Sequence, residues 1–228
     1  AQCTVLIDGL PMKSCITPLR EGMDIRTLVH YPTLPPDDEL RPSRRPPELS
    51  CQVLVVGAGP SGITAAIELA DAGYSVILVD HKDHLGGKLV LQTHKFFGSM
   101  ADCYAGTRGT DIAKILEEEA RKRENITIMT DSVVVGVFAD GKAGIYQPQE
   151  ERYLLLSFAG VIVATGARER SLVFPGNDLP GVFGAGAFQT LVNRDLVKSS
   201  ERVLIVGCGN VGLIAAYHAL QAGIDVVA

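Results

Sequence analysis

The 228-residue chain lacks the features that mark several classes of protein. Its five cysteines are too few for a disulfide scaffold, so a reducing, cytoplasmic setting is expected. A formal charge of −5 argues against a general polyanion-binding surface, and the clusters RPSRR and EARKRE are typical of a linker and a solvated helix face rather than a nucleic-acid site. No apolar run approaches the roughly 20 residues needed to span a membrane. Without an initial Met or a secretory signal, the sequence indicates a fragment of a longer protein.

What is present divides the chain into three blocks. The apolar content of 46% is ample for one large or two small cores. Residues 1–31 are short alternating pieces, whereas residues 32–50 contain six of the twelve prolines together with charged residues. Such a stretch predicts an extended linker. From Cys51 onward the pattern becomes strand, glycine turn, helix and strand.

The third block has the pattern of an α/β protein. Val53–Val56 is a continuous apolar run, as expected of a parallel strand that is buried on both faces. Helices are predicted at 61–72 and 111–123, and a further strand at 75–79. Shorter strand-like pieces follow in ITIMT, SVVVGVFA, YLLLSF and GVIVATG. The predicted fold is a doubly wound parallel sheet, Rossmann-like, with a small β-meander at 133–158 inserted on it.

A glycine pattern follows the first strand of this block. Gly57, Gly59 and Gly62 form G-x-G-x-x-G between a strand and a helix. The first glycine permits a tight turn, the second lets the backbone approach a pyrophosphate, and the third lets the helix pack closely. Asp80 ends the next strand, where a carboxylate can bind ribose hydroxyls. The whole arrangement predicts dinucleotide binding, and the alternative is a glycine turn that only packs.

The same pattern returns 150 positions later in VLIVGCGNVGLIAAYHALQAGIDVVA. Gly207, Gly209 and Gly212 repeat the spacing, which predicts the start of a second Rossmann-like domain; a helix-packing element without a ligand is the alternative. The counterpart of Asp80 would be residue 230, and the chain ends at 228. The choice between NAD and NADP is therefore not determined.

The combination of these motifs resembles the pyridine nucleotide-disulfide reductase superfamily. The stretches that carry the resemblance are VVGAGPSGITAAIELADAGYSVILVD, the glycine pair in HLGGK, and GVIVATGA. The resemblance covers roughly residues 53–228 and implies an FAD site followed by an NAD(P) site. The implied FAD contacts are Gly57, Gly59, Pro60, Ser61, Gly62, Asp80, Gly86, Gly87, Lys88, Val134, Ala164, Thr165 and Gly166. The implied NAD(P) contacts are Gly207, Gly209, Asn210 and Gly212.

The chain departs from the disulfide reductases of this superfamily in its cysteines. The segment that would carry C-x4-C holds only Cys103, and Cys208 inside the second glycine turn is interpreted as a small packed residue. A dithiol role is disfavoured. The same segment contains four side chains suited to a flavin-facing site, namely His94, Lys95, Tyr104 and Arg108. The alternative is a polar loop that leads to the next helix. No catalytic residue is therefore assigned.

The first block contains two cysteines, Cys3 and Cys15, around the hairpin-like VLIDGLPM. The pair could be coincidental, but its setting resembles the end of a plant-type 2Fe-2S ferredoxin domain. The resemblance implies that Cys3 and Cys15 are the third and fourth cluster ligands. The first two would then lie upstream, with a cysteine directly before Ala1.

The expected organisation has five parts: 1–31, the end of a ferredoxin-like domain; 32–50, a linker; 51–168, an FAD-binding domain; 169–199, a connection; and 200–228, the start of an NAD(P)-binding domain. This arrangement resembles the large subunits of sarcosine oxidase and related amine dehydrogenases. It implies an FAD-dependent oxidoreductase that exchanges hydride with NAD(P)H and passes electrons through a 2Fe-2S centre. The partner would be a small-molecule substrate or an electron-transfer subunit of a hetero-oligomer. The alternatives are a subunit of an amine or amino-acid dehydrogenase, or a non-catalytic chain that binds nucleotides.

Overall fold

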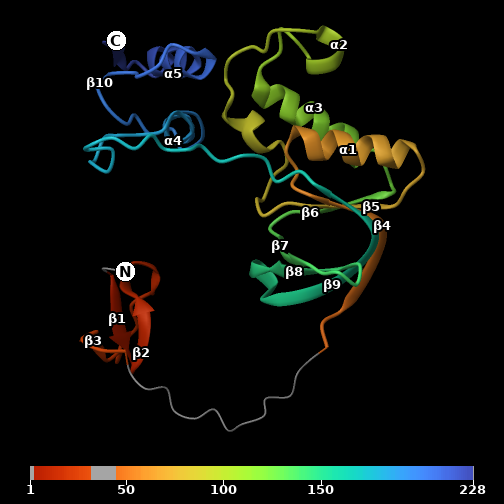
Figure 1. Ribbon diagram of the computed structural model, residues 1–228, viewed down its shortest axis with the longest axis horizontal. Helices are drawn as coiled ribbons and strands as arrows, with labels where there is room; N and C mark the ends of the chain where they lie inside the picture. Colours follow the sequence, from red (N-terminus) through yellow and green to blue (C-terminus); the bar gives the residue numbers. More distant parts are fainter. Residues whose placement is uncertain (1–2, 32–44, 228) are drawn as a thin grey trace. The chain divides into compact units, whose positions relative to one another are not determined.

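A computed structural model describes residues 3–31 and 45–227 of the chain (Figure 1). Two compact units are present, Ala1–Arg45 and Pro46–Ala228. Most of the expected linker, residues 32–44, lies outside the described residues. No helix in the described part of the chain combines the length and the apolar character that a membrane crossing needs.

The first unit contains a small antiparallel sheet with strand order β2-β1-β3. Its strands are β1 (Thr4–Ile7), β2 (Leu10–Lys13) and β3 (Ile25–Thr27), and the short 3-10 helix η1 (Ser14–Ile16) follows β2. Asp8 and Gly9 both have positive φ, +51° and +84°, which is the geometry of a tight two-residue hairpin turn. The sequence DG between two apolar runs explains this hairpin, as expected from VLIDGLPM.

The second unit is built on a mixed sheet with strand order β6-β5-β4-β9-β8-β7. Four strands are parallel to their neighbours: β4 (Glu48–Val56), β5 (Val76–Val79), β6 (Ile126–Met129) and the second half of β9 (Arg152–Val163). Since β4 begins at Glu48, residues 48–50 belong to this strand and not to the linker. The parallel α/β architecture predicted from the sequence is confirmed.

The expected meander is an extension of the same sheet. β7 (Val133–Val137) and β8 (Lys142–Gln147) are antiparallel, and β8 pairs with the first half of β9. The prediction of separate strands at YLLLSF and GVIVATG was wrong, because β9 runs through both. One continuous strand can pair with β8 at its start and with β4 further along, so no turn is needed between the two pieces.

Apolar side chains form separate cores on the two faces of this sheet. Neighbouring residues of a strand point to opposite faces, so Leu54 belongs to one core and Val55 to the other. All four residues of β5 are buried, as expected of a strand that is covered on both sides. Helices α1 (Pro60–Asp71) and α3 (Gly109–Arg121) lie side by side over one face (Figure 1) and supply Ile63 and Ile112 to its core.

Within the second unit, the chain after β9 begins another strand–turn–helix–strand arrangement of the same design. Helix α4 (Ala185–Gln189) and a π-helical turn η4 (Thr190–Arg194) precede β10 (Arg202–Val203), α5 (Asn210–Gln221) and β11 (Asp225–Val226). β10 and β11 are parallel, and Phe188, Ala219 and Ile224 contribute to a third apolar cluster. The remaining short elements are η2 (Gly87–Leu91), α2 (Met100–Cys103) and η3 (Pro148–Glu150).

The core of the sheet supports a test of the fold. Leu78 in β5 has no exposed surface, whereas Leu172 in the connection is 70% exposed. We expect Leu78→Ala to lower the free energy of unfolding by about 2–5 kcal/mol, because it leaves a cavity in a close-packed core. Leu172→Ala is the matched control and should change it by less than about 0.5 kcal/mol. Urea denaturation measures both, and equal effects of the two substitutions would contradict the described core.

Candidate functional site

The first glycine turn brings three stretches of backbone into contact. Gly57 has φ +105°, and a Cβ there would overlap the carbonyl oxygen of Ala164, at the end of β9. A Cβ on Gly62 would overlap the carbonyl oxygen of Gly57 and would lie 3.2 Å from the Cβ of Ala164. Both positions therefore require glycine, for the reasons expected of a tight turn and close helix packing.

Gly59 differs because its surroundings are open. Apart from its two chain neighbours, no described residue has an atom within 4 Å of the place that a Cβ on Gly59 would take, so the backbone can be approached from outside. Gly59 is the N-cap of α1, and no side chain caps this helix start. Pro60 and Ser61 in the first turn are exposed. An uncapped helix start with open backbone above it is suited to binding phosphate.

The glycine pair after β5 packs against this turn. Gly86 donates its N–H to the carbonyl oxygen of Ala58 at 2.8 Å, and both glycines have positive φ, +102° and +54°. A Cβ on Gly87 would lie 2.8 Å from the Cα of Gly59. The pair thus forms one wall of the open space at Gly59. Lys88 follows in η2, and its Nζ lies 3.9 Å from the place that a Cβ on Gly186 would take.

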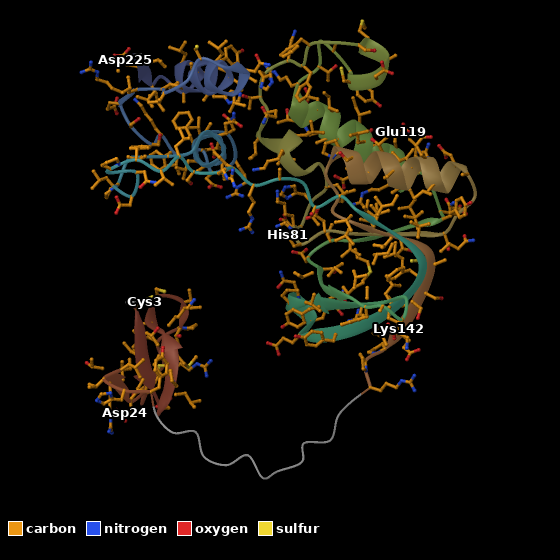
Figure 2. All side chains as sticks on the ribbon, viewed as in Figure 1. Cys3, Asp24, His81, Glu119, Lys142 and Asp225 are labelled. Carbon is orange, nitrogen blue, oxygen red and sulfur yellow. The ribbon has the colours of Figure 1, made fainter. Side chains whose placement is uncertain are left out.

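Asp80 connects the end of β5 to the same turn. Its buried carboxylate accepts the N–H of Ala58 at 2.6 Å on one oxygen and the N–H of Lys82 at 3.0 Å on the other. His81, labelled in Figure 2, lies beside it with Nδ1 3.3 Å from Oδ1. A carboxylate has about four acceptor positions, so Asp80 keeps capacity for ribose hydroxyls.

The remaining residues of the first site lie around this centre. The N–H of Ala164 donates to Val56 at 2.8 Å, so the A-T-G stretch, which includes Thr165 and a left-handed Gly166 at φ +74°, continues directly past the glycine turn. The N–H of Ser132 donates to the carbonyl oxygen of Asp80 at 3.0 Å and places the start of β7 there. Val134 follows on β7, which among the described strands pairs only with β8.

The second glycine turn repeats the geometry of the first. Gly207 has φ +112°, and Gly209 has φ −73° and ψ 176°, compared with −75° and 179° at Gly59. A Cβ on Gly212 would overlap the carbonyl oxygen of Gly207, just as in the first copy. Asn210 begins α5, and no side chain caps that helix start either. The two turns are the same structural device.

A hollow of about 290 Å³ lies at the second turn and is lined by Ile205, Gly207, Cys208, Gly212, Leu213, Ala216 and Val226. The interpretation of Cys208 as a packed residue was wrong, because its side chain is exposed. At the same place in the first turn Ala58 is only 1% exposed, so the exposure of Cys208 depends on what surrounds the turn and not on the turn itself. The position that would correspond to Asp80 has no counterpart in this chain, which ends at 228.

The four polar residues considered near a flavin do not form one group. Lys95 and Arg108 are partners in an isolated β-bridge, which closes the loop between them. Tyr104 packs against the apolar core under α1 and α3. The imidazole of His94 stacks on Phe96 with ring centroids 5.4 Å apart, and burial lowers the pKa of His94.

Glu169 is a further residue that the sequence did not predict. Its carboxylate accepts the N–H groups of Ala185 and Gly186 at 2.7 and 2.9 Å.

In the first unit the structure places Cys3 and Cys15 together. Cys3 lies at one end of the small sheet and Asp24 at the other (Figure 2). The sulfur atoms of the two cysteines are 3.5 Å apart, and the hydrogen bond between them raises the pKa of Cys15. Two thiolates on one tetrahedral ion lie roughly 3.8 Å apart when each metal–sulfur bond is about 2.3 Å. The pair fits half of a cluster site, and the described residues hold no group of three or more metal-ligating side chains.

The fold and the two glycine turns define a Rossmann-like dinucleotide-binding protein. Residues 51–228 match the family described as "Pyridine nucleotide-disulphide oxidoreductase". The chain belongs to this family, and the predictions of an oxidoreductase and of a flavoprotein fold are confirmed at that level.

Curated relatives and solved structures agree with this assignment. The chain is 33% identical over 190 residues to the alpha subunit of sarcosine oxidase from Rhizobium meliloti, and the aligned part is 78% of this chain and 18% of that protein. It is 33% identical over 180 residues to the HcnB subunit of hydrogen cyanide synthase from Pseudomonas protegens, where the aligned part is 78% of this chain and 38% of the relative. The chain thus spans well under half of either relative. The L-proline dehydrogenase of P. horikoshii shares the fold, with a TM-score of 0.70 and 23% sequence identity. The match covers 98% of this chain and 43% of the dehydrogenase chain.

The contrast between Gly62 and Gly59 gives a test of the first turn. We expect Gly62→Ala to lower the free energy of unfolding by about 2 kcal/mol or more, because the new methyl group overlaps the backbone at Gly57. Gly59→Ala should change it by less than about 1 kcal/mol, because its Cβ meets open space. Denaturant titration of both variants measures the difference, and a fully stable Gly62→Ala protein would contradict the described turn.

Proposed function

We propose that this chain is the nucleotide-binding part of an FAD-dependent oxidoreductase that exchanges hydride with NAD(P)H and passes electrons through a 2Fe-2S centre to or from a partner. The observation that carries the proposal is the repetition of one phosphate-binding turn on a single chain. Two dinucleotides with connected chemistry need two such turns. When bound, FAD supplies a flavin that can take up two electrons at once and release them singly.

The residues around the first turn support the FAD assignment. The open backbone at Gly59 and the uncapped start of α1 would receive the pyrophosphate. Asp80 would bind the ribose, since its carboxylate is held in place by two backbone N–H groups. The pair Gly86–Gly87 and the stretch Ala164–Gly166 would lie along the cofactor. The backbone at Val134 would meet the adenine, since the side chain of Val134 packs against a core of the sheet.

The second turn supports a nicotinamide dinucleotide. Gly207, Gly209, Asn210 and Gly212 would hold its pyrophosphate by the same contacts as the first turn. An acidic residue at the end of the second strand would favour NAD, and a nearby arginine would favour NADP. In the first unit, Cys3 and Cys15 would supply two of the four thiolates of a 2Fe-2S cluster, and their close approach supports a shared metal ion.

The second candidate is a subunit of an amine or amino-acid dehydrogenase. Two of the relatives are named as subunits of sarcosine oxidase and of opine oxidase, so each is one part of a larger enzyme. This supports a hetero-oligomer in which substrate oxidation occurs at a different flavin or on a partner chain. A protein that binds nucleotides without turnover is the third candidate, and the intact geometry of both turns argues against it.

The visible absorption spectrum tests the main proposal. We expect the full-length parent protein, purified without air, to show flavin and iron–sulfur bands that bleach when NADH or NADPH is added. The nucleotide that bleaches them at the lower concentration identifies the nicotinamide preference. Flavin that is reduced by amines and not by either nucleotide would favour the second candidate. A colourless protein would contradict both cofactor assignments.

Asp80 gives a residue-level test of the FAD site. We expect Asp80→Asn to weaken FAD binding about tenfold or more, because the amide NH₂ would face a backbone N–H that the carboxylate now accepts. Asp140→Asn, at an exposed turn, is the matched control and should not change the affinity. Titration of the apoprotein with FAD, followed by flavin fluorescence, measures both. Equal affinities would remove Asp80 from the site.

A further inference from the structure

Two cysteines of the first unit lie side by side at one end of its small sheet. Cys3 directly precedes β1, and Cys15 lies in η1, the short helix that follows β2. The two sulfur atoms are 3.5 Å apart, and both cysteines are free thiols. Two thiols in contact can undergo a reaction that neither can undergo alone, which is the formation of a disulfide.

The β-hairpin holds the two cysteines in place. In its register Thr4 lies opposite Lys13, so the next pair of residues toward the open end is Cys3 and Ser14. The backbone N–H and the hydroxyl of Ser14 both donate to the carbonyl oxygen of Cys3, at 2.9 and 3.0 Å. The approach of the sulfur atoms is therefore fixed by strand pairing and by these two hydrogen bonds.

A reagent in solution can reach this pair in the described part of the chain. Cys15 is exposed, and Cys3 is partly exposed. Cys208 is exposed as well, but it forms no hydrogen bond with another described cysteine. It therefore provides a comparison in which the thiol is accessible and has no neighbouring thiol.

The pair can complete a disulfide without any further residue. A 2Fe-2S cluster needs four protein ligands, and the described residues hold no group of three or more metal-ligating side chains. A disulfide needs only the two sulfur atoms, at a bond length of about 2.05 Å. From their separation of 3.5 Å the sulfur atoms have to approach by roughly 1.5 Å, which rotation about side-chain bonds can supply.

We propose that Cys3 and Cys15 form a reversible disulfide when the protein carries no metal and meets a small disulfide such as oxidised glutathione. Cys15, the more exposed of the two, attacks one glutathione sulfur and releases one reduced glutathione. Cys3 then attacks the sulfur of Cys15 and displaces the second glutathione. The S–S bond of glutathione breaks and one protein S–S bond forms. The protein loses two electrons and two protons, which leave in two molecules of reduced glutathione.

The disulfide and the proposed cluster exclude each other, because both use the same two sulfur atoms. Oxidation of the metal-free protein would therefore block the uptake of iron until a reductant such as dithiothreitol opens the disulfide. Only this consequence rests on the proposed function. The disulfide itself depends on the contact between the two thiols.

Peptide mass spectrometry tests the proposal, because Lys13 lies between the two cysteines. Trypsin cleaves after Lys13 and after Arg20, so Cys15 is released in the peptide SCITPLR and Cys3 in the peptide before it. The full-length parent protein is freed of metal with a chelator, treated with oxidised glutathione and digested without reductant. We expect SCITPLR to be joined to the peptide that ends at Lys13, with the loss of two hydrogens, and to be released by dithiothreitol. If SCITPLR remains unlinked, the proposal is wrong.

Two variants separate this pair from the other thiols. Cys15→Ser should abolish the linked peptide and leave Cys3 with one bound glutathione. Cys208→Ser is the matched control for an exposed cysteine outside the pair and should keep the full yield of the linked peptide. A linked peptide whose yield falls equally in both variants would contradict the assignment of the disulfide to Cys3 and Cys15.

Denaturation separates the effect of the fold from the closeness of the two cysteines in the sequence. At a fixed glutathione concentration, we expect unfolding in guanidinium chloride to lower the ratio of linked peptide to glutathione adducts about tenfold or more, because the hairpin no longer holds the thiols together. The same ratio in the folded and the unfolded protein would overturn the proposal.

The visible absorption of the same protein before chelation reports separately on the cluster. Iron–sulfur bands, followed by unlinked thiols after chelation and glutathione treatment, would overturn the disulfide and leave the proposed function in place. A linked peptide from a protein without these bands would support the disulfide and count against the cluster.

Discussion

The structure depends on the close approach of three backbone stretches at the first glycine turn. The carbonyl oxygen of Gly57 faces the start of α1 at Gly62, and the end of β9 at Ala164 passes against both. A side chain at either glycine would separate helix from sheet. Once these backbones are in contact, the start of α1 is placed above the ends of β4 and β9, where parallel strands leave room for a ligand.

Asp80 makes the same turn rigid from the other side. By accepting N–H groups from Ala58 and Lys82, its carboxylate joins the glycine turn to the end of β5 before any nucleotide is bound. A binding site whose groups are already oriented loses less entropy when the ligand enters. The second turn has the same glycines and the same open helix start, but a Cβ on Gly207 would meet no described atom within 4 Å, so only the contact between Gly207 and Gly212 is shared by the two turns.

Sequence reasoning found these features because they depend on local rules. Glycine at 57 and 62, an acid at the end of the next strand, and apolar runs buried on both faces each follow from the spacing of a few neighbouring residues. It missed the continuity of β9, since pairing with two different strands is decided across the sheet and not along one segment. Cys208 was misjudged for a similar reason, because exposure inside a turn depends on the surrounding fold.

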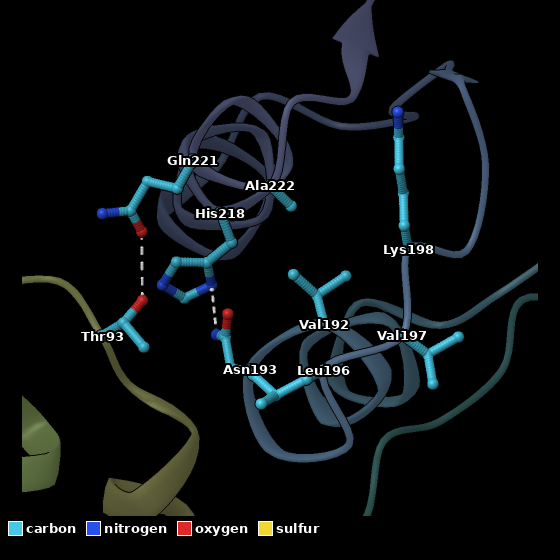
Figure 3. A pocket seen from close by; sticks show the side chains of 9 residues that line it. All are labelled: Thr93, Val192, Asn193, Leu196, Val197, Lys198, His218, Gln221 and Ala222. Carbon is cyan, nitrogen blue, oxygen red and sulfur yellow. Dashed lines mark hydrogen bonds between the residues drawn. The ribbon is translucent and has the colours of Figure 1, made fainter.

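By itself, the sequence determined the α/β class, the two glycine turns and the position of Asp80, since periodicity and turn chemistry act over short distances. Only the tertiary structure decided what surrounds them. The contact between the sulfur atoms of Cys3 and Cys15 depends on strand pairing. The hydrogen bonds from Leu91 through Asn193 to His218 join residues that are far apart in the chain, and Figure 3 shows the one between Asn193 and His218. No local pattern marks a histidine on an apolar helix as part of such a network, because its partners are chosen by how helices and loops pack.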